Sequence, residues 1–315
     1  MSETIISVKN LKKYFDVKDR GKLHAVDDLS FDIKEGETLG LVGESGCGKS
    51  TTGRVLLRLI PATGGQVIYR GEDVLAAKPA QLKVLRRKMQ MIFQDPYSCL
   101  DPRKTVRQII AEPLLVQKLY KGRALWQKVE ELMAATGVTA EMADKFPHEL
   151  DGGRRQRVGI TRALALNPEF IVCDEPVSAL DVSIQAQILN LLQDLQEKMG
   201  LTYLFISHDL SVVKHISQRI MVMYLGRIVE EATSEELFQQ PLHPYSQALL
   251  SAIPVPKIGK QRERIILKGD VPSPINPAPG CRFAKRCWRA EERCSKEEPV
   301  LREVAPGHRV ACHLL

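Results

Sequence analysis

A glycine-rich loop near the start of the chain has the residue types that bind a phosphate chain. Residues 43–51 read Gly-Glu-Ser-Gly-Cys-Gly-Lys-Ser-Thr and fit the pattern G-x-x-x-x-G-K-[ST]. The glycines let the backbone wrap a phosphate chain, and the N–H groups of the loop and of a following helix can point at it. Lys49 can reach the β- and γ-phosphates, and the Ser50 hydroxyl can bind Mg²⁺. The loop therefore predicts a nucleoside triphosphate site.

A pair of carboxylates further along the chain supplies what hydrolysis needs. The apolar run at 170–173 reads as a buried strand and ends in Asp174 and Glu175. Asp174 can hold Mg²⁺ through water, and Glu175 can orient or deprotonate the attacking water. An isolated acidic pair is often only a solvated strand end. Together with the loop at Gly43, however, it predicts a nucleoside triphosphatase.

The elements that must position these residues follow an α/β pattern. Short apolar or alternating runs predict strands at 5–8, 29–33, 38–42 and 89–93, and a helix is expected from Ser50 to about Leu59. Apolar residues recur at helical spacing between 101 and 150, which predicts a helical insertion. Helices at 153–166, 183–198 and 209–217 then alternate with strands at 169–173, 202–206 and 220–224. This alternation is typical of a mostly parallel sheet with helices packed on it.

Size and charge leave several partners open. The chain has 315 residues, 44% of them hydrophobic, and no window approaches 18 consecutive apolar residues. The first residues lack a basic segment followed by a long apolar stretch, so secretion is not expected. Partner chains would have to hold the protein at a membrane. The net charge of +7 suits nucleotide phosphates, an anionic membrane face or nucleic acid.

Further motifs, taken in order, resemble the ABC ATPase family. Residues 150–158 read Leu-Asp-Gly-Gly-Arg-Arg-Gln-Arg-Val, similar to the signature loop of that family. Gln94 follows a predicted strand, residues 178–181 read Ser-Ala-Leu-Asp, and His208 follows the strand at 202–206. The resemblance covers essentially the whole chain. It implies a P-loop ABC ATPase with a RecA-like core, an antiparallel β subdomain and a helical subdomain, plus a small C-terminal Cys-rich appendage.

The resemblance also implies domain boundaries. Residues 1–97 and 156–235 would form the nucleotide-binding core with its β subdomain. Residues 98–155 would form the helical subdomain with the signature loop. Residues 236–315 would form a C-terminal region specific to importers.

Roles for single residues come from the same resemblance. ATP would be sandwiched in a head-to-tail dimer, and Phe15, or the neighbouring Tyr14, would stack on adenine. Glu175 would be the general base, Gln94 would sense Mg²⁺ and the attacking water, and His208 would contact the γ-phosphate. The magnesium contacts would be Ser50, Gln94 and Asp174. The remaining nucleotide contacts would be Gly43, Ser45, Gly46, Cys47, Gly48, Lys49, Thr51 and, from the signature side, Asp151, Gly152, Gly153 and Asp181.

The signature departs from the family at two positions. The family usually has Ser where this chain has Asp151, and Gln where it has Arg154. A hydroxyl can donate to a γ-phosphate, whereas an ionised carboxylate cannot and would repel it. Either Arg154 or Arg155 pairs with Asp151 and supplies the missing positive charge, or the site to which this loop contributes hydrolyses ATP poorly.

The C-terminal region resembles peptide and nickel importer ATPases. The motifs are Pro-Leu-His-Pro-Tyr at 241–245 with its continuation to Pro254, Gly-Asp-Val-Pro-Ser-Pro at 269–274, and Pro-Gly-Cys at 279–281. Importers of this kind use two different ATPases, and the sequence Gly-Cys-Gly at 46–48 is more similar to the second, F-type one. The resemblance implies a paired ABC ATPase in a heterodimer, two transmembrane permease subunits and an extracytoplasmic solute-binding protein. It places the chain peripherally on the cytoplasmic face of the membrane, with no nucleic-acid partner.

Four cysteines near the end of the chain predict a metal site. Five, six and 17 residues separate Cys281, Cys287, Cys294 and Cys312 in turn. Four thiolates suit tetrahedral zinc or a [4Fe–4S] cluster, but the C-x₂₋₄-C pairs typical of zinc ribbons are missing. The family resemblance favours the iron–sulfur cluster, with zinc and an empty site as alternatives. Metal–thiolate bonds would fold an appendage too small to build its own core.

Two other functions stay open from the sequence. A soluble ABC ATPase could act on nucleic acid or ribosomes, although such proteins usually carry two cassettes or a long coiled-coil insertion. An iron–sulfur redox sensor could use ATP as a switch. The transported solute, whether peptide, nickel chelate or glycoside, is not specified because the ATPase does not touch it.

Overall fold

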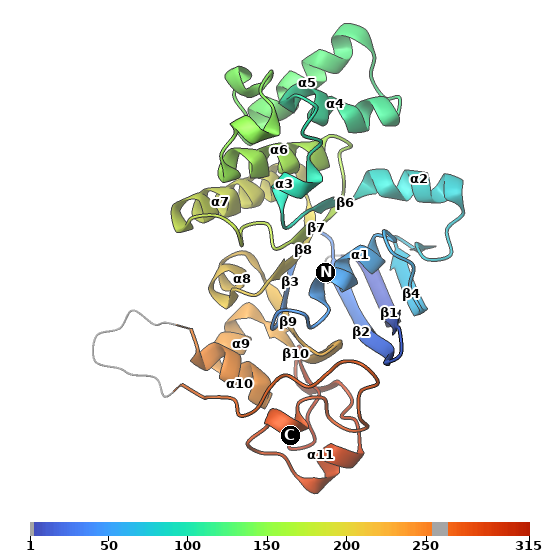
Figure 1. Ribbon diagram of the computed structural model, residues 1–315, viewed down its shortest axis with the longest axis vertical. Helices are drawn as coiled ribbons and strands as arrows, with labels where there is room; N and C mark the ends of the chain where they lie inside the picture. The colour runs from blue at the N-terminus through green and yellow to red at the C-terminus, as the bar shows by residue number, and fades with distance from the viewer. Residues whose placement is uncertain (1–2, 254–263) are drawn as a thin grey trace, which may run out of the picture. The chain divides into compact units, whose positions relative to one another are not determined.

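The computed structural model in Figure 1 describes residues 3–253 and 264–315. The first two residues and Pro254, the last residue of the motif at 241–254, therefore lie outside the described residues. The chain divides into two compact units. One contains residues 77–206, and the other contains residues 3–76 and 207–315.

The second unit holds a sheet around the strand that leads into the phosphate loop. Strand β3 (Thr38–Val42) is buried at every position, as expected for an apolar strand covered on both faces. It pairs in parallel with β9 (Arg219–Tyr224). Strands β10 (Arg227–Thr233), β12 (His308–Val310) and β11 (Arg302–Ala305) continue the sheet in antiparallel pairs. Helix α8 (Leu210–Ile216) packs on β3.

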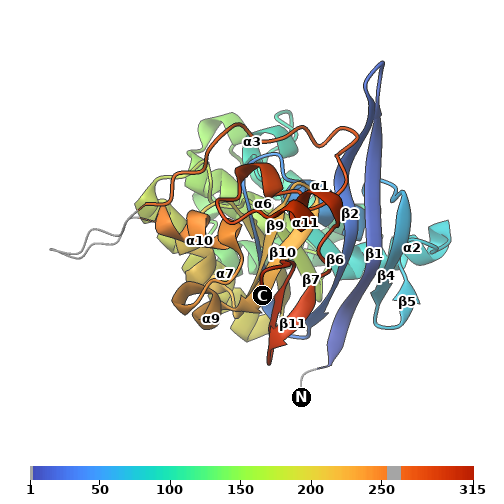
Figure 2. The ribbon, with the colours of Figure 1, turned by 90° about the horizontal axis from the view of Figure 1, so that it is seen from below.

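A separate antiparallel sheet in the same unit has the order β2-β1-β4-β5 (Figure 2). Strands β1 (Thr4–Val17) and β2 (Gly21–Lys34) form one long hairpin, to which β4 (Gly64–Tyr69) and β5 (Glu72–Asp73) add. These strands are much longer than the runs predicted at 5–8 and 29–33. The apolar alternation is interrupted by register shifts in the hairpin, so the pattern predicts only the regular parts.

Helices α1 (Lys49–Leu56), α9 (Ser234–Gln239), α10 (Pro244–Ser251) and α11 (Glu292–Lys296) complete this unit. The C-terminal region is thus not a separate body, because β12 pairs with β10 of the sheet. Sequence reasoning missed these two tail strands, which have only three and four residues.

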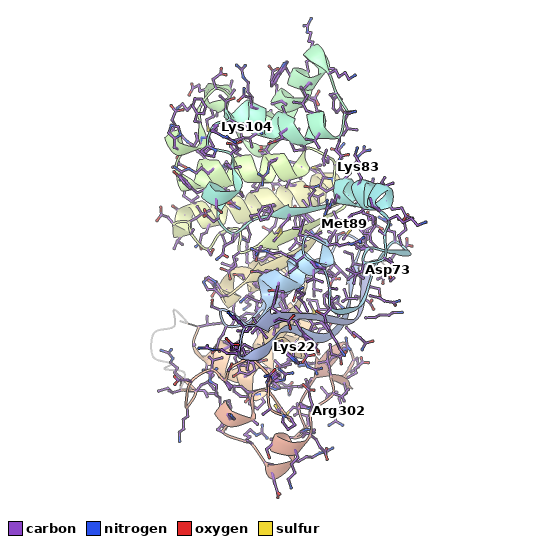
Figure 3. All side chains as sticks on the ribbon, turned by 45° about the vertical axis from the view of Figure 1, so that its right-hand side comes forward. Lys22, Asp73, Lys83, Met89, Lys104 and Arg302 are labelled. Carbon is purple, nitrogen blue, oxygen red and sulfur yellow. The ribbon has the colours of Figure 1, made fainter. Side chains whose placement is uncertain are left out.

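The unit of residues 77–206 combines parallel strands with helices. Strands β6 (Met89–Ile92), β7 (Phe170–Asp174) and β8 (Thr202–Ser207) pair in parallel in that order. Met89, labelled in Figure 3, begins β6 where α2 (Pro79–Lys88) ends. The other helices are α3 (Pro96–Cys99), α4 (Val106–Val116), α5 (Gly122–Thr136), α6 (Gly152–Leu164) and α7 (Val182–Met199).

The helical insertion predicted at 101–150 is confirmed. Apart from two short 3-10 turns, α4 and α5 are the regular elements of this stretch, and both pack on α6. A capping box between Thr105 and Gln108 begins α4, and Gly137 in the left-handed conformation ends α5. The alternating elements predicted after residue 150 also form, each within one or two residues of its expected bounds.

Candidate functional site

The phosphate loop lies between β3 and α1, as its pattern requires. Gly48 has φ +107, and a Cβ atom there would lie 1.9 Å from the carbonyl oxygen of Ala25. Only glycine fits such a position. Gly48 also precedes α1, whose first N–H groups receive no side-chain cap from it. The loop and the helix terminus therefore present the backbone donors that a phosphate chain needs.

Lys49 is held against the loop by hydrogen bonds. Its Nζ donates to the carbonyl oxygens of Gly43 and Glu44 over 2.8 and 3.0 Å, and the residue is only 4% exposed. Cys47 is buried too, and burial raises the pKa of its thiol. Cys47 can thus contribute to phosphate binding through its backbone, whereas the lysine supplies a positive charge.

Of the two neighbouring aromatic residues on β1, Tyr14 contacts other side chains of the protein and Phe15 is exposed. The Tyr14 ring stacks on His24 at 4.0 Å, and its hydroxyl donates to Asp27 over 2.5 Å. Phe15 is 36% exposed, with the Lys13 ammonium 4.7 Å from the ring centroid. Because Tyr14 is engaged within the protein, Phe15 is the better candidate to stack on a base.

In the other unit, two of the predicted catalytic residues are in contact. The Gln94 side-chain amide donates to a carboxylate oxygen of Glu175 over 3.1 Å. Asp174 is completely buried as the last residue of β7, and the Glu175 backbone N–H donates to the carbonyl oxygen of Ile206 over 2.9 Å. Glu175 adopts φ +46, a left-handed conformation uncommon outside glycine. The hydrogen bond holds a carboxylate and an amide side by side, and both groups are of kinds that can bind a water molecule.

The signature loop begins helix α6. Asp151 caps the helix by accepting a hydrogen bond from the Arg154 backbone N–H over 2.8 Å. Its carboxylate also lies 3.2 Å from the Arg154 Nε, with the two side chains 62% and 53% exposed. The Arg155 guanidinium instead donates to the Pro147 carbonyl oxygen. Of the two arginines proposed to pair with Asp151, the structure shows Arg154 in that role.

The glycines of the signature meet a neighbouring helix. A Cβ atom on Gly153 would lie 2.6 Å from the Ile184 side chain, and one on Gly152 would lie 3.1 Å from Leu180. Glycine thus allows α6 to approach α7 closely. Asp181 is exposed and precedes α7 without making a side-chain cap. Asp151 and Asp181 are exposed, whereas Gly153 is buried, and contact of these residues with a partner subunit stays a prediction.

His208 belongs to the same unit as the phosphate loop. It is exposed and follows β8, ahead of Asp209, whose carboxylate caps α8. The structure thus brings Gln94 to Glu175 in one unit and assembles Gly43–Thr51 in the other. The prediction that these two sets of residues meet around one magnesium-bound triphosphate stays a prediction.

The four C-terminal cysteines share one small region of the fold. The Cys281 N–H donates to the Cys294 carbonyl oxygen over 2.7 Å, and none of the four is in a disulfide. Burial raises the pKa of the Cys281 thiol to about 11, and the charges of Cys294, Cys287 and Cys312 act in the same direction. Nevertheless, within residues 3–253 and 264–315, no three His, Cys, Asp or Glu side chains are arranged to hold a metal ion. The predicted metal site is therefore not supported by the arrangement of these thiols.

Two contacts to the phosphate loop have no signal in the sequence. The Tyr245 hydroxyl accepts a hydrogen bond from the Glu44 N–H over 2.9 Å, and Arg286 Nη1 donates to the Glu44 carboxylate over 2.9 Å. These residues lie 201 and 242 positions from Glu44. No local pattern could have predicted such pairs.

Among the described residues, the helices are all too short or too polar to cross a lipid bilayer.

Comparison with protein families gives two matches. The family described as "ABC transporter" matches residues 26–178. The family described as "Oligopeptide/dipeptide transporter, C-terminal region" matches residues 229–294. The first match spans the phosphate loop, the signature and the acidic pair, and the second reaches the third of the four cysteines.

Individual proteins match over the whole length. The chain is 54% identical to the oligopeptide transport ATP-binding protein AppF of Bacillus subtilis, over 99% of this chain and 98% of that protein. It is 55% identical to the putative oligopeptide transport ATP-binding protein YkfD of the same organism, over 98% and 95% of the two chains. Among solved structures, the dimeric ATP-binding cassette MJ0796 bound to ADP and Pi aligns with a TM-score of 0.67 and 29% identity. That alignment covers 73% of this chain and 98% of the cassette.

Proposed function

The chain belongs to the ABC transporter family of ATP-binding proteins, and from this premise we propose that it is the ATP-hydrolysing subunit of a peptide importer. The relatives it matches along nearly their entire length are named as oligopeptide transport ATP-binding proteins. One structural observation carries the catalytic part of the proposal, namely the contact between Gln94 and Glu175 at the end of a buried strand.

The phosphate loop is proposed to bind the triphosphate of ATP. Lys49 would exchange its bonds to the loop carbonyl oxygens for the β- and γ-phosphates, while backbone N–H groups from Ser45 to Thr51 hold the phosphate oxygens. Phe15 would stack on adenine. The Ser50 hydroxyl and the Asp174 carboxylate are proposed to hold Mg²⁺, because hydroxyl and carboxylate oxygens are the ligands this ion prefers. When bound, it would neutralise charge on the phosphate oxygens.

Hydrolysis is proposed to use Glu175 as the general base. The Glu175 carboxylate accepts a proton from a water molecule as the water oxygen attacks the γ-phosphorus, and the bond to the ADP oxygen breaks. The Gln94 amide, held 3.1 Å from that carboxylate, restricts its orientation and can bind the same water. His208 would donate to the γ-phosphate.

A head-to-tail dimer would complete each site. The signature residues Asp151–Gly153 and Asp181 of one subunit would face the nucleotide held by the phosphate loop of the other. Because Arg154 lies against Asp151, the pair presents a guanidinium beside the carboxylate, which reduces its repulsion of a γ-phosphate. Binding of ATP would close the dimer, and loss of the γ-phosphate would let the subunits part.

Membrane transport requires other chains. We infer a paired ABC ATPase in a heterodimer, two permease subunits and an extracytoplasmic solute-binding protein, with this chain peripheral on the cytoplasmic face. Within unit 77–206, the segment 98–155 would act as the helical subdomain that transmits closure to the permeases. The core would comprise 1–97 and 156–235, and the importer-specific region 236–315.

We also propose that the four cysteines hold a [4Fe–4S] cluster. A single zinc ion requires four ligands that converge on one point, whereas a cluster spreads its thiolates over four iron atoms. The arrangement of the thiols does not itself form a metal site among the described residues. The proposal is supported by the spacing of Cys281, Cys287, Cys294 and Cys312 and by the resemblance of this region to importer ATPases. When bound, it would stabilise the fold of the tail. Anaerobic purification should yield a brown, iron-containing protein with broad absorption near 400 nm, and a colourless, iron-free product would overturn this proposal.

The transport function is tested with the assembled complex in proteoliposomes. Peptide uptake and ATP hydrolysis should both require this subunit, and Lys49→Ala should abolish both by weakening ATP binding. Peptide uptake that continues at the full rate with Lys49→Ala would contradict the proposal. Stimulation of the ATPase by nucleic acid, rather than by the permeases and binding protein, would favour a soluble ABC ATPase.

A further inference from the structure

The segment between Cys281 and Cys287 contacts the phosphate loop directly. Arg286 Nη1 donates to the Glu44 carboxylate over 2.9 Å and lies 3.5 Å from the Tyr224 hydroxyl. The Arg286 side chain is 9% exposed and that of Glu44 is 29% exposed, so most of this ion pair is shielded from water. Glu44 is the second residue of the phosphate loop, and the ion pair therefore ties the C-terminal region to the ATP site.

A second contact reaches the same residue from helix α10. The Glu44 backbone N–H donates to the Tyr245 hydroxyl over 2.9 Å. Both the backbone and the side chain of Glu44 are thus held by residues of the segment between β10 and β11. Lys49 adds a third bond, since its Nζ donates to the Glu44 carbonyl oxygen.

An aromatic cluster fixes the two partners of Glu44. The Phe283 ring is buried edge-on against Tyr224, with centroids 5.2 Å apart, and lies 5.4 Å from the Tyr245 ring. The rings of Tyr224 and Tyr245 are themselves 4.6 Å apart. Because these side chains pack in one group, the Tyr245 hydroxyl and the Arg286 guanidinium have little freedom to move away from Glu44.

We propose that Arg286 and Tyr245 are positioning residues for the phosphate loop and set its affinity for ATP. This inference rests on the proposed binding of phosphates by Gly43–Thr51. Arg286 keeps the Glu44 carboxylate neutralised beside a site that binds a triphosphate, and Tyr245 fixes the backbone where the loop begins. A loop held in its binding geometry loses less conformational entropy when ATP binds.

The kinetic signature of such a role is specific. The loop contacts the phosphates in the ground state and in the transition state, so loosening it weakens both equally. The Michaelis constant KM for ATP should rise, whereas kcat should change little. A purely structural role would instead lower the amount of folded protein and leave the KM of the remaining molecules unchanged.

The experiment compares Arg286→Met and Tyr245→Phe with a matched control, Arg309→Met. Arg309 pairs with Glu231 over 3.0 Å in the same C-terminal region, and Glu231 lies on β10 rather than in the phosphate loop. ATP binding to the purified complex is measured by titration with a fluorescent ATP analogue, and KM and kcat by ATP hydrolysis. Thermal unfolding without nucleotide monitors the fold.

We expect Arg286→Met and Tyr245→Phe to raise KM about tenfold with kcat within about twofold of wild type, and Arg309→Met to leave KM unchanged. The double variant Glu44→Gln/Arg286→Met should recover most of the affinity, because no carboxylate then faces the phosphates. Arg286→Lys, which keeps the charge, should fall between the single variant and wild type.

Three results would overturn the inference: an unchanged KM in Tyr245→Phe, an equal KM rise in Arg309→Met, or a double variant no better than Arg286→Met. Tyr245→Phe removes a single oxygen atom, so it decides the matter even if Arg286→Met does not fold. Lys49→Ala separates this inference from the proposed function. If Lys49→Ala loses ATP binding but Arg286→Met and Tyr245→Phe bind ATP normally, only the role of Arg286 and Tyr245 is contradicted. If Lys49→Ala binds ATP normally, the phosphate site itself is contradicted.

Discussion

Replacing Arg154 by Gln should slow ATP hydrolysis by the assembled transporter about tenfold, because Asp151 would then face a γ-phosphate without its neighbouring positive charge. Two unit charges 4 Å apart interact by about 4 kcal/mol at an effective dielectric constant of 20. The Asp151 and Arg154 side chains are 62% and 53% exposed, so water and salt screen much of this interaction. About a third of it, roughly 1.4 kcal/mol, corresponds to a tenfold change in rate.

The double variant Asp151→Ser/Arg154→Gln restores the residues usual in the family and should return the rate to within about threefold of wild type. Asp151→Ser alone should also stay within about threefold, since the guanidinium remains and a hydroxyl can donate to phosphate. Serine is a good helix cap, so α6 should keep its start in both variants. Melting temperatures of all three variants should therefore stay close to that of wild type.

The assay is steady-state hydrolysis of ATP by the complex with its paired ATPase and permeases, with thermal unfolding as the control for folding. If Arg154→Gln hydrolyses ATP at the wild-type rate, the guanidinium does not compensate for Asp151. A large gain in Asp151→Ser would lead to the same conclusion and would indicate that the natural signature contributes to a poorly active site.

Three further variants test single features of the site. Phe15→Ala should raise the KM for ATP about tenfold, since stacking on a base contributes about 1–3 kcal/mol. Tyr14→Phe should leave the KM nearly unchanged. If both variants change the affinity equally in titrations with ATP, Phe15 is not the stacking residue. Gly48→Ala should abolish ATP binding, because its Cβ would lie 1.9 Å from a carbonyl oxygen, and normal binding would show that the loop adapts. Burial lowers the pKa of His243 to about 4, so the unfolded chain binds a proton between pH 6.5 and 4 that the folded chain does not. The contribution of this residue to the free energy of unfolding is thus fully present above pH 6.5, and about 3 kcal/mol of it is lost toward pH 4. His243→Asn keeps an acceptor for the Tyr245 N–H and should flatten the decline in melting temperature from pH 7 to 5. A decline identical to that of wild type would contradict this cause.

The phosphate loop and the acidic pair could be predicted because their signals are local. Three closely spaced glycines between an apolar strand and a helix indicate the conformation of the loop, and β3 has the bounds expected from its four apolar or β-branched residues. The strand before Asp174 is likewise a continuous apolar run. For such segments, composition and spacing over about ten residues decide the structure.

Contacts between distant segments could not be predicted in this way. The hydrogen bond from Glu44 to Tyr245 and the ion pair with Arg286 depend on packing of the aromatic rings around Phe283. The tail strands β11 and β12 are too short and polar for a period-two pattern, and they form because β10 offers an edge to pair with. The sequence offers both Arg154 and Arg155 as partners of Asp151, and only the side-chain geometry distinguishes them.

The most direct measurement is a crystal structure of the dimer carrying Glu175→Gln with Mg²⁺ and ATP. We expect Lys49 Nζ on the γ-phosphate, the Ser50 hydroxyl on the metal, Asp174 within one water of it, and the residue at 175 facing the γ-phosphorus. A structure in which ATP binds at Gly43–Thr51 but Asp174 and the residue at 175 lie away from its magnesium ion would contradict the proposed site.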